Sequence, residues 1–194
     1  MALEVFLLRH GETVWNTEGR VQGEHDSPLT SRGREQAHVL GRILAKQLGR
    51  RHQLPMYVSP LGRARETAAI VQQHAESALV IVEPRIREVS LGAWEGLTRA
   101  EIDAGWPGLT DGLTGPEWYL RAPGAETYAE CEQRVQAWLD EQDESVIAVS
   151  HGVAGRIIRG LYLGLSREQI LALSVPQDIV WHLAGGTVTA VSAC

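Results

Sequence analysis

Two short apolar runs, far apart in the chain, end in the same way: a histidine and then a glycine follow soon after each. Residues 5–8 lead into His10, and residues 146–149 lead into His151. Runs of this length and composition are typical of strands buried on both faces of a parallel sheet. Since the ligands of such sheets bind in the crevice at the carboxyl ends of the strands, we expect both histidines at one crevice.

The rest of the chain alternates between strand-like and helix-like segments. The expected strands span residues 3–8, 55–58, 79–82, 145–149, 179–183 and 187–192, and the expected helices span residues 31–48, 61–75, 125–141, 153–163 and 167–173. Thr30 can cap the first helix, and Gly185-Gly186 predicts a hairpin turn between the last two strands. The alternation favours an α/β fold with a mainly parallel sheet. No linker is evident, so we expect one domain over residues 1–194.

Residues 92–125 break this alternation. The segment is rich in glycine and proline, and we expect an insertion with short helices that forms a lid over the active site. It contains Trp106, Trp118 and Tyr119. These aromatic side chains are equally compatible with packing of the lid and with contact to a substrate.

Composition and charge exclude several classes of function. The net charge of −6 argues against a protein that binds nucleic acid or anionic membranes nonspecifically. No apolar stretch is long enough to span a membrane, and the first residues lack the basic segment of a signal peptide. Cys131 and Cys194 have neither metal-site spacing nor a disulfide framework, so we expect no metal site and a cytoplasmic location.

His10 is the candidate nucleophile. A neutral imidazole can attack phosphorus and can leave again from a phosphohistidine. Arg9 carries a planar guanidinium that can bind a phosphate through two parallel hydrogen bonds. The alternatives are a structural histidine and a surface ion pair, and the triplet Arg9-His10-Gly11 does not by itself decide between these interpretations.

Arg63 is the second candidate phosphate ligand. It follows the second strand at the start of a helix, where the helix dipole also favours anions. Arg65 competes with it, but positions two apart on a helix point about 200° away from each other, so only one of the two can face a pocket. We expect Arg63 in the pocket and Arg65 on the surface.

Glu88 is the candidate proton donor. Phosphoryl transfer to His10 needs a proton for the departing alkoxide, and hydrolysis of the phosphohistidine needs a base for water. One carboxyl group can do both in turn. Glu12 and Glu95 are rivals for this role, and an ion pair with a neighbouring arginine is the structural alternative for Glu88.

Further polar groups could bind phosphate oxygens. His151 can donate a hydrogen bond and share the charge of the transition state, although a structural histidine is a common alternative. Asn16, Gln22 and the amide of Gly23 follow the first strand and could supply neutral donors. Gly152, directly after His151, is a candidate of the same kind.

The motifs that carry these candidates occur in a fixed order. They are Leu8-Arg9-His10-Gly11-Glu12-Thr13, Trp15-Asn16, Gln22-Gly23, Leu29-Thr30, Ser59-Pro60-Leu61 with Arg63-Ala64, Glu88, Trp94-Glu95-Gly96, Pro123-Gly124 with Glu126, and Ser150-His151-Gly152. In this order and spacing they resemble the histidine phosphatase superfamily, in its phosphoglycerate mutase-like branch and its small broad-specificity phosphatase type.

The resemblance implies a three-layer α/β/α fold and a phosphohistidine intermediate on His10. It implies a phosphate pocket built from Arg9, Arg63 and His151, with Glu88 as proton donor and then base. It also implies that neither a metal ion nor a cofactor is needed, because the arginines and histidines already balance the phosphate charge.

Within such a family, a mutase must hold a phosphoglycerate carboxylate, which calls for extra cations at the entrance. Residues 97–125 contain only Arg99 and Arg121 among several acidic residues. We therefore expect a metal-independent phosphatase acting on a small phosphorylated metabolite. The alternatives are a cofactor-dependent phosphoglycerate mutase and a non-catalytic phosphate-binding regulator; both a monomer and a homodimer are compatible with the sequence.

Overall fold

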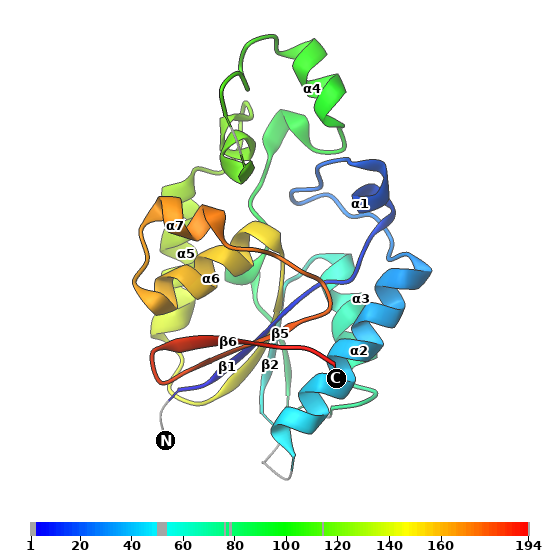
Figure 1. Cartoon of the computed structure of the whole chain (residues 1–194), viewed down its shortest axis with the longest axis vertical. Helices are drawn as coiled ribbons and strands as arrows, with labels where there is room; N and C mark the ends of the chain where they lie inside the picture. The colour runs from blue at the N-terminus through cyan, green and yellow to red at the C-terminus, as the bar shows by residue number, and fades with distance from the viewer. Residues whose placement is uncertain (1–2, 50–53, 76, 78, 114, 194) are drawn as a thin grey trace.

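The computed structural model describes residues 3–49, 54–75, 77, 79–113 and 115–193. Its centre is a six-stranded sheet in the order β3-β2-β4-β1-β5-β6, with helices on both faces (Figure 1). The strands are β1 (Val5–Arg9), β2 (Met56–Val58), β3 (Val80–Val82), β4 (Val146–Ser150), β5 (Val180–Ala184) and β6 (Thr187–Val191).

The helices include seven α-helices in the described residues. They are α1 (Val14–Glu18), α2 (Ser31–Leu48), α3 (Gly62–Val71), α4 (Arg99–Gly105), α5 (Tyr128–Asp140), α6 (Gly152–Leu163) and α7 (Arg167–Ala172). Three short 3-10 helices accompany them: η1 (Pro84–Ile86), η2 (Gly92–Trp94) and η3 (Gly115–Arg121). None of the helices within the described ranges is both long and apolar enough to cross a bilayer.

The two faces of the sheet bury separate apolar clusters, because side chains alternate along each strand. In β1, Val5 and Leu7 join a cluster with residues of α5 and α6, whereas Phe6 and Leu8 join a cluster with residues of α2 and α3. Figure 1 shows α2 and α3 on one side of the sheet and α5, α6 and α7 on the other. The expected three-layer α/β/α arrangement is therefore confirmed.

The register of the sheet places the two histidines side by side. Strands β1 and β4 are parallel neighbours, with Arg9 opposite Ser150. The backbone N–H of His10 donates to the carbonyl oxygen of Ser150 at 3.0 Å, which extends the pairing by one residue. The rings of His10 and His151 consequently lie 5.1 Å apart, centroid to centroid.

The sheet is parallel from β3 through β2 and β4 to β1, whereas β5 runs antiparallel to β1 and β6 antiparallel to β5. The hairpin predicted at Gly185-Gly186 is confirmed, and both glycines have a positive φ. Ala184 on β5 pairs with Thr187 on β6, directly next to the turn.

Most expected elements are present, with shifted ends. The helix over 31–48 is confirmed, and the Thr30 side chain caps it by accepting from the N–H of Gly33 at 2.9 Å. The helix expected over 61–75 already ends at Val71. The helix expected from 125 begins at Tyr128, because Thr127 forms a capping box with Glu130.

The segment 92–125 contains η2, α4 and η3 and lies beyond the carboxyl ends of the parallel strands (Figure 1). Its aromatic residues pack on one another: the ring of Trp94 lies 6.1 Å from Trp106 and 5.8 Å from Trp118, and Trp118 lies 4.2 Å from Tyr119. The two tryptophans 106 and 118 thus serve the packing of this segment. Cys194 falls outside the described residues.

Candidate active site

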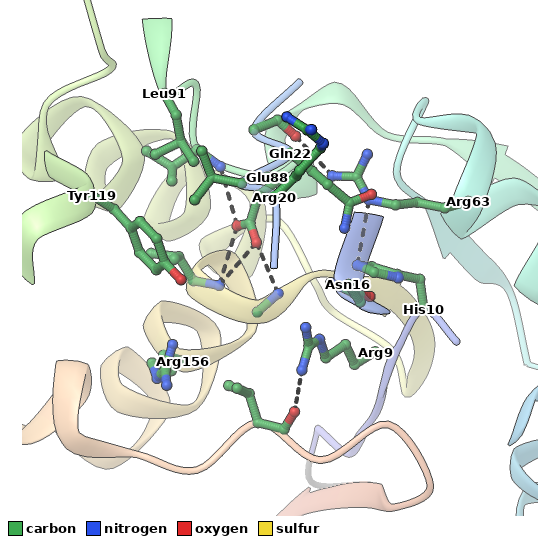
Figure 2. Close-up of a pocket in the computed structure, with 16 residues that line it drawn as sticks. Arg9, His10, Asn16, Arg20, Gln22, Arg63, Glu88, Leu91, Tyr119 and Arg156 are labelled. Carbon is green, nitrogen blue, oxygen red and sulfur yellow. Dashed lines mark hydrogen bonds between the residues drawn. The ribbon is translucent and has the colours of Figure 1, made fainter. Parts of the chain in front are cut away.

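A pocket of about 280 Å³ opens at the carboxyl ends of the parallel strands. Eight of the nine candidate residues line it: Arg9, His10, Asn16, Gln22, Gly23, Arg63, Glu88 and Gly152. His151 does not line it. Figure 2 shows the pocket with Glu88 and Arg9 near its middle, His10 and Arg63 on one side, and Tyr119 and Arg156 on the other.

His10 is buried, and its surroundings fix which ring nitrogen carries the proton. Nδ1 lies 2.8 Å from the carbonyl oxygen of Gly11, which can only accept, so Nδ1 carries the hydrogen. Nε2 is then the unprotonated nitrogen of the neutral ring. The Nε of Arg63 lies 3.4 Å from this Nε2 and donates to it. The nitrogen that faces the arginine is therefore the one able to attack.

The environment of His10 keeps its ring neutral. Burial, followed by the positive charges of Arg63 and Arg9, holds the pKa of His10 well below its usual value of 6.5. A neutral imidazole is the form that can attack phosphorus. The nucleophilic form is thus available at neutral and mildly acidic pH.

Arg63 is held rigidly at the start of α3. Its Nη1 donates to the carbonyl oxygen of His25 at 2.6 Å and to the carboxylate of Asp26 at 3.0 Å, and its Nη2 donates to the carbonyl oxygen of Gly23 at 2.7 Å. The Asp26 carboxylate also accepts from the N–H of Gly62 at 2.6 Å. The loop after β1 and the start of α3 therefore fix one another around this guanidinium.

Arg9 has one buried N–H donor, at Nε, that pairs with none of the described residues. One terminal nitrogen donates to the carbonyl oxygen of Val175, whereas Nε is buried without a hydrogen-bond partner in the described structure. Burial lowers the pKa of Arg9, an effect that the charge of Glu88 opposes. A buried N–H without a partner costs free energy, which an anionic ligand in the pocket would recover.

Glu88 lies at the N-terminus of α6. Its carboxylate accepts from the backbone N–H groups of Gly152 at 2.9 Å, Val153 at 3.1 Å and Ala154 at 3.0 Å. The N–H of Val89 also donates to it, at 3.1 Å. The N–H groups of Gly152, Val153 and Ala154 are ones that the first turn of a helix leaves unpaired, so Glu88 is fixed where it can face both the pocket and α6.

His151 is buried beside His10. Its Nε2 lies 2.6 Å from the hydroxyl oxygen of Ser59, and its Nδ1 has no partner among the described residues. Burial and then the charge of Arg63 hold the pKa of His151 well below its usual value. Its ring is thus neutral, and it lies next to the ring of His10 without lining the pocket.

The smaller candidates differ in what they can offer. The side-chain oxygen of Asn16 accepts from Gln177 at 3.2 Å and from the N–H of Thr13 at 3.1 Å, while no partner is found for its amide N–H groups in the described part of the chain. The side-chain oxygen of Gln22 is buried and has no hydrogen-bond partner among the residues that the structure describes. Gly152 lines the pocket, and its N–H donates to Glu88 at 2.9 Å.

Comparison with known proteins now decides the family. Residues 5–184 match the family model described as histidine phosphatase superfamily (branch 1). The chain belongs to this superfamily. Its members are enzymes, phosphatases and mutases. A probable phosphoglycerate mutase, GpmB of Erwinia tasmaniensis, is 36% identical over 172 residues, which cover 84% of this chain and 76% of that protein.

Solved structures that are similar to this chain include one that is named a phosphatase. YhfR of Bacillus stearothermophilus is 33% identical, with a TM-score of 0.78, and the match covers 97% of this chain and 95% of that one. A mycobacterial glucosyl-3-phosphoglycerate phosphatase, solved with VO3, is 29% identical, with a TM-score of 0.76, over 100% of this chain and 99% of that one.

In this histidine phosphatase superfamily member, the rival candidates lie away from the pocket. Glu12 accepts from the hydroxyl of Thr30 at 2.9 Å. Glu95 accepts from the N–H of Leu91 at 2.8 Å and of Glu24 at 3.0 Å. Neither carboxylate lines the pocket, and Arg65 is exposed on α3.

Sequence reasoning missed two pocket arginines. Arg156 on α6 and Arg20 in the loop after α1 both line the pocket. The expectation of an entrance poor in cations was wrong, because it counted only residues 97–125. The helical spacing of four between Gly152 and Arg156 was a signal that could have placed Arg156 on the pocket face.

A search of the described residues finds no group of three or more His, Cys, Asp or Glu side chains that could hold a metal ion. The pocket instead gathers four arginines and one histidine, His10, around a single carboxylate, Glu88. Chemically, such a site suits an anion with several oxygens.

Proposed function

We propose that the chain is a phosphatase that hydrolyses small phosphate monoesters through a phosphohistidine on His10, without a metal ion. The observation that carries this proposal is the unprotonated Nε2 of His10, which lies 3.4 Å from Nε of Arg63 at a pocket lined by arginines. Nε2 attacks phosphorus, the bond from phosphorus to the ester oxygen breaks, and the charge on the phosphoryl oxygens is shared by Arg9 and Arg63.

Glu88 supplies the proton in the first step and takes one in the second. In its carboxylic acid form it protonates the departing alkoxide. As a carboxylate it then accepts a proton from the water that attacks the phosphohistidine, the P–N bond breaks, and His10 and Glu88 return to their starting forms. Its position in the pocket, fixed by the N–H groups of α6, supports this role.

Other residues would bind rather than react. Asn16 has amide N–H groups free to donate to a phosphoryl oxygen, and the N–H of Gly23 and the amide of Gln22 line the same pocket. We assign His151 a positioning role next to His10. We also assign the activity to the cytoplasm, in keeping with the two cysteines that form no disulfide framework.

A phosphoglycerate mutase is the second candidate. Two observations favour it: the similar GpmB protein is named a probable phosphoglycerate mutase, and Arg20 and Arg156 add cations to the pocket. The phosphatase is preferred because it needs only the groups around His10 and Glu88, and because similar solved structures include a phosphatase at 29% identity.

The test is phosphate release in the presence of a chelator, from a panel of phosphate monoesters that includes an aryl phosphate and 3-phosphoglycerate. We expect release to be retained with chelator and to fall by a factor on the order of 10⁴ or more in His10→Ala. His38→Ala, at a half-buried histidine on α2 that pairs with His74 and does not line the pocket, is the matched control and should behave as the wild type.

Three results would decide against this function. Activity retained in His10→Ala would remove the nucleophile. Isomerisation of phosphoglycerate with little phosphate release would favour the mutase. Binding of phosphate with no turnover of any ester, and no alkali-stable phosphoryl label on the protein, would favour a non-catalytic regulator.

A further inference from the structure

The pocket has a second polar end, away from the candidate nucleophile. In Figure 2, Arg156 and the hydroxyl end of Tyr119 lie across Glu88 from His10. Arg156 comes from α6 and Tyr119 from η3, so the body of the fold and the lid segment meet there. Both residues line the pocket, and neither belongs to the group around His10.

Two of the other three arginines that line the pocket already form ion pairs with carboxylates. Arg20 pairs with Glu18 at 3.0 Å and with Glu101 at 2.9 Å. Arg63 pairs with Asp26 at 3.0 Å. Their charges are therefore balanced before any substrate arrives.

Arg156 is different. Its Nε donates to the carbonyl oxygen of Leu173 at 2.6 Å, which fixes the side chain in place. Its four terminal N–H groups have no hydrogen-bond partner, and no carboxylate pairs with it, among the described residues. Since the guanidinium is half-buried, burial lowers its pKa, an effect that the charge of Glu88 opposes. The terminal N–H groups of this guanidinium, which is held in place at Nε, can therefore bind an anion.

Tyr119 adds a fifth donor. No hydrogen bond to its hydroxyl is found in the described structure, and its ring is held by Trp118 at 4.2 Å, centroid to centroid. Burial raises the pKa of Tyr119, and so does the charge of Glu88, which keeps the hydroxyl protonated and able to donate. The hydroxyl and the guanidinium thus offer donors at the same end of the pocket.

We propose that Arg156 and Tyr119 form a second anion subsite, which binds a carboxylate or a second phosphate on the alcohol part of the substrate. This inference rests on the proposed function, because Arg9 and Arg63 are assigned to the phosphoryl group that is transferred. The preferred substrates are then phosphate monoesters with a second negative group a few bonds from the ester oxygen. Neutral alcohols leave the Arg156 donors unpaired and are the poorer substrates.

The test compares pairs of esters that differ only in the second charge. For a carboxylate the pair is 3-phosphoglycerate and glycerol 3-phosphate; for a phosphate it is fructose 1,6-bisphosphate and fructose 6-phosphate. We expect the charged member of at least one pair to have a kcat/KM roughly 10-fold or more above its neutral partner. The pair with the larger ratio identifies the second anion.

Substitution then assigns the preference to these residues. Arg156→Gln should lower kcat/KM for the preferred charged ester by roughly 10- to 100-fold, as for loss of a charge-assisted hydrogen bond, with a much smaller loss for its neutral partner. Tyr119→Phe should lower it by roughly 2- to 10-fold. Arg156→Lys should restore part of the preference. Arg42→Gln, at an exposed ion pair with Glu35, is the control and should leave the ratio unchanged.

Ratios near one in the wild type, or equal losses on both members of a pair in Arg156→Gln, would overturn the subsite. Binding gives a readout that does not depend on turnover. The two esters of each pair are titrated by calorimetry into the His10→Ala variant, and equal affinities would again overturn it. If an aryl phosphate is hydrolysed but neither pair shows a preference for the second charge, this inference is refuted and the proposed function stands. If no ester is hydrolysed but the charged member of a pair binds more tightly, the proposed function is refuted and the anion subsite stands.

Discussion

Arg134 on α5 holds the backbone that carries Glu88. Its Nη1 donates to the carbonyl oxygens of Arg85 at 2.5 Å and Arg87 at 3.0 Å, and its Nη2 donates to that of Glu88 at 3.3 Å. Glu126 pairs with it at 2.6 Å and 2.9 Å. The side chains of Arg134 and Glu126 are only 11% and 8% exposed. We predict that Arg134→Met, which keeps a stem of similar width and removes the charge, impairs both the fold and the placement of Glu88.

The magnitude follows from what the substitution leaves behind. Three carbonyl oxygens lose a donor, and the Glu126 carboxylate is left buried with a weaker partner, Arg87 at 3.3 Å. Removing one member of a buried ion pair typically costs about 3–5 kcal/mol of unfolding free energy. The double variant Arg134→Met/Glu126→Leu removes the stranded charge as well, so its loss should be smaller than the sum of the two single losses by roughly 0.5–3 kcal/mol.

The assay is urea unfolding followed by tryptophan fluorescence, since the chain has six tryptophans. The exposed pair of Arg42 and Glu35 gives the matched control, and Arg42→Met should cost less than about 1 kcal/mol. Kinetics at a temperature where the variant is folded then separate the two effects. If Arg134 positions Glu88, kcat should fall more on an alkyl phosphate, whose leaving group needs a proton, than on an aryl phosphate.

Two results would refute this reasoning. If Arg134→Met lowers the free energy of unfolding no more than Arg42→Met does, water replaces the three contacts to carbonyl oxygens at no cost in stability. A loss of stability without any difference between alkyl and aryl phosphates would make Arg134 a structural residue that does not position Glu88.

Three other predictions concern single groups. Replacing Glu88 by Gln should slow alkyl phosphates much more than aryl phosphates in steady-state kinetics; equal losses would point to another acid. Because the pKa values of His10 and His151 are lowered in the folded state by burial and by nearby arginine charge, the unfolded chain takes up protons below about pH 6.5 that the folded chain does not. The free energy of unfolding should therefore fall as the pH drops from 6.5 towards 5, by up to about 1.4 kcal/mol per pH unit for each histidine, and a flat profile in urea titrations would contradict this. Gly160→Ala would place a Cβ 2.1 Å from Cγ1 of the buried Ile170, so it should destabilise by about 1–3 kcal/mol despite the better helix propensity of alanine, whereas unchanged or higher thermal stability would contradict the close packing of α6 on α7.

Periodicity and strand ends were sufficient to predict the central elements of this fold. The apolar runs before His10 and His151 are fully buried in β1 and β4, as their composition indicated. Helix α1 was not predicted because five residues are too few to show a helical period. The antiparallel direction of β5 depends on which edge of the sheet the chain reaches after α7, and no local pattern encodes that.

The residues of the site also differ in whether a local sequence pattern could predict them. Residues that belong to a motif, such as His10 and Arg63, were named correctly as pocket residues. Arg156 was missed because it lies outside the motifs, on a mostly apolar helix that carries a second arginine, Arg159. The contacts of Glu88 with the N–H groups of α6 join residues more than 60 positions apart, and only the folded sheet brings them together.

The pairing of β1 with β4 has a consequence for the order of events during folding. The first parts of the site to leave the ribosome are Arg9 and His10, and the last parts are His151, Arg156 and the carbonyl oxygen of Val175 that holds Arg9. Contacts between such distant segments form late, because a long loop must close first. During refolding, activity should therefore return only when β1 pairs with β4. Folding intermediates that form before this pairing should be inactive.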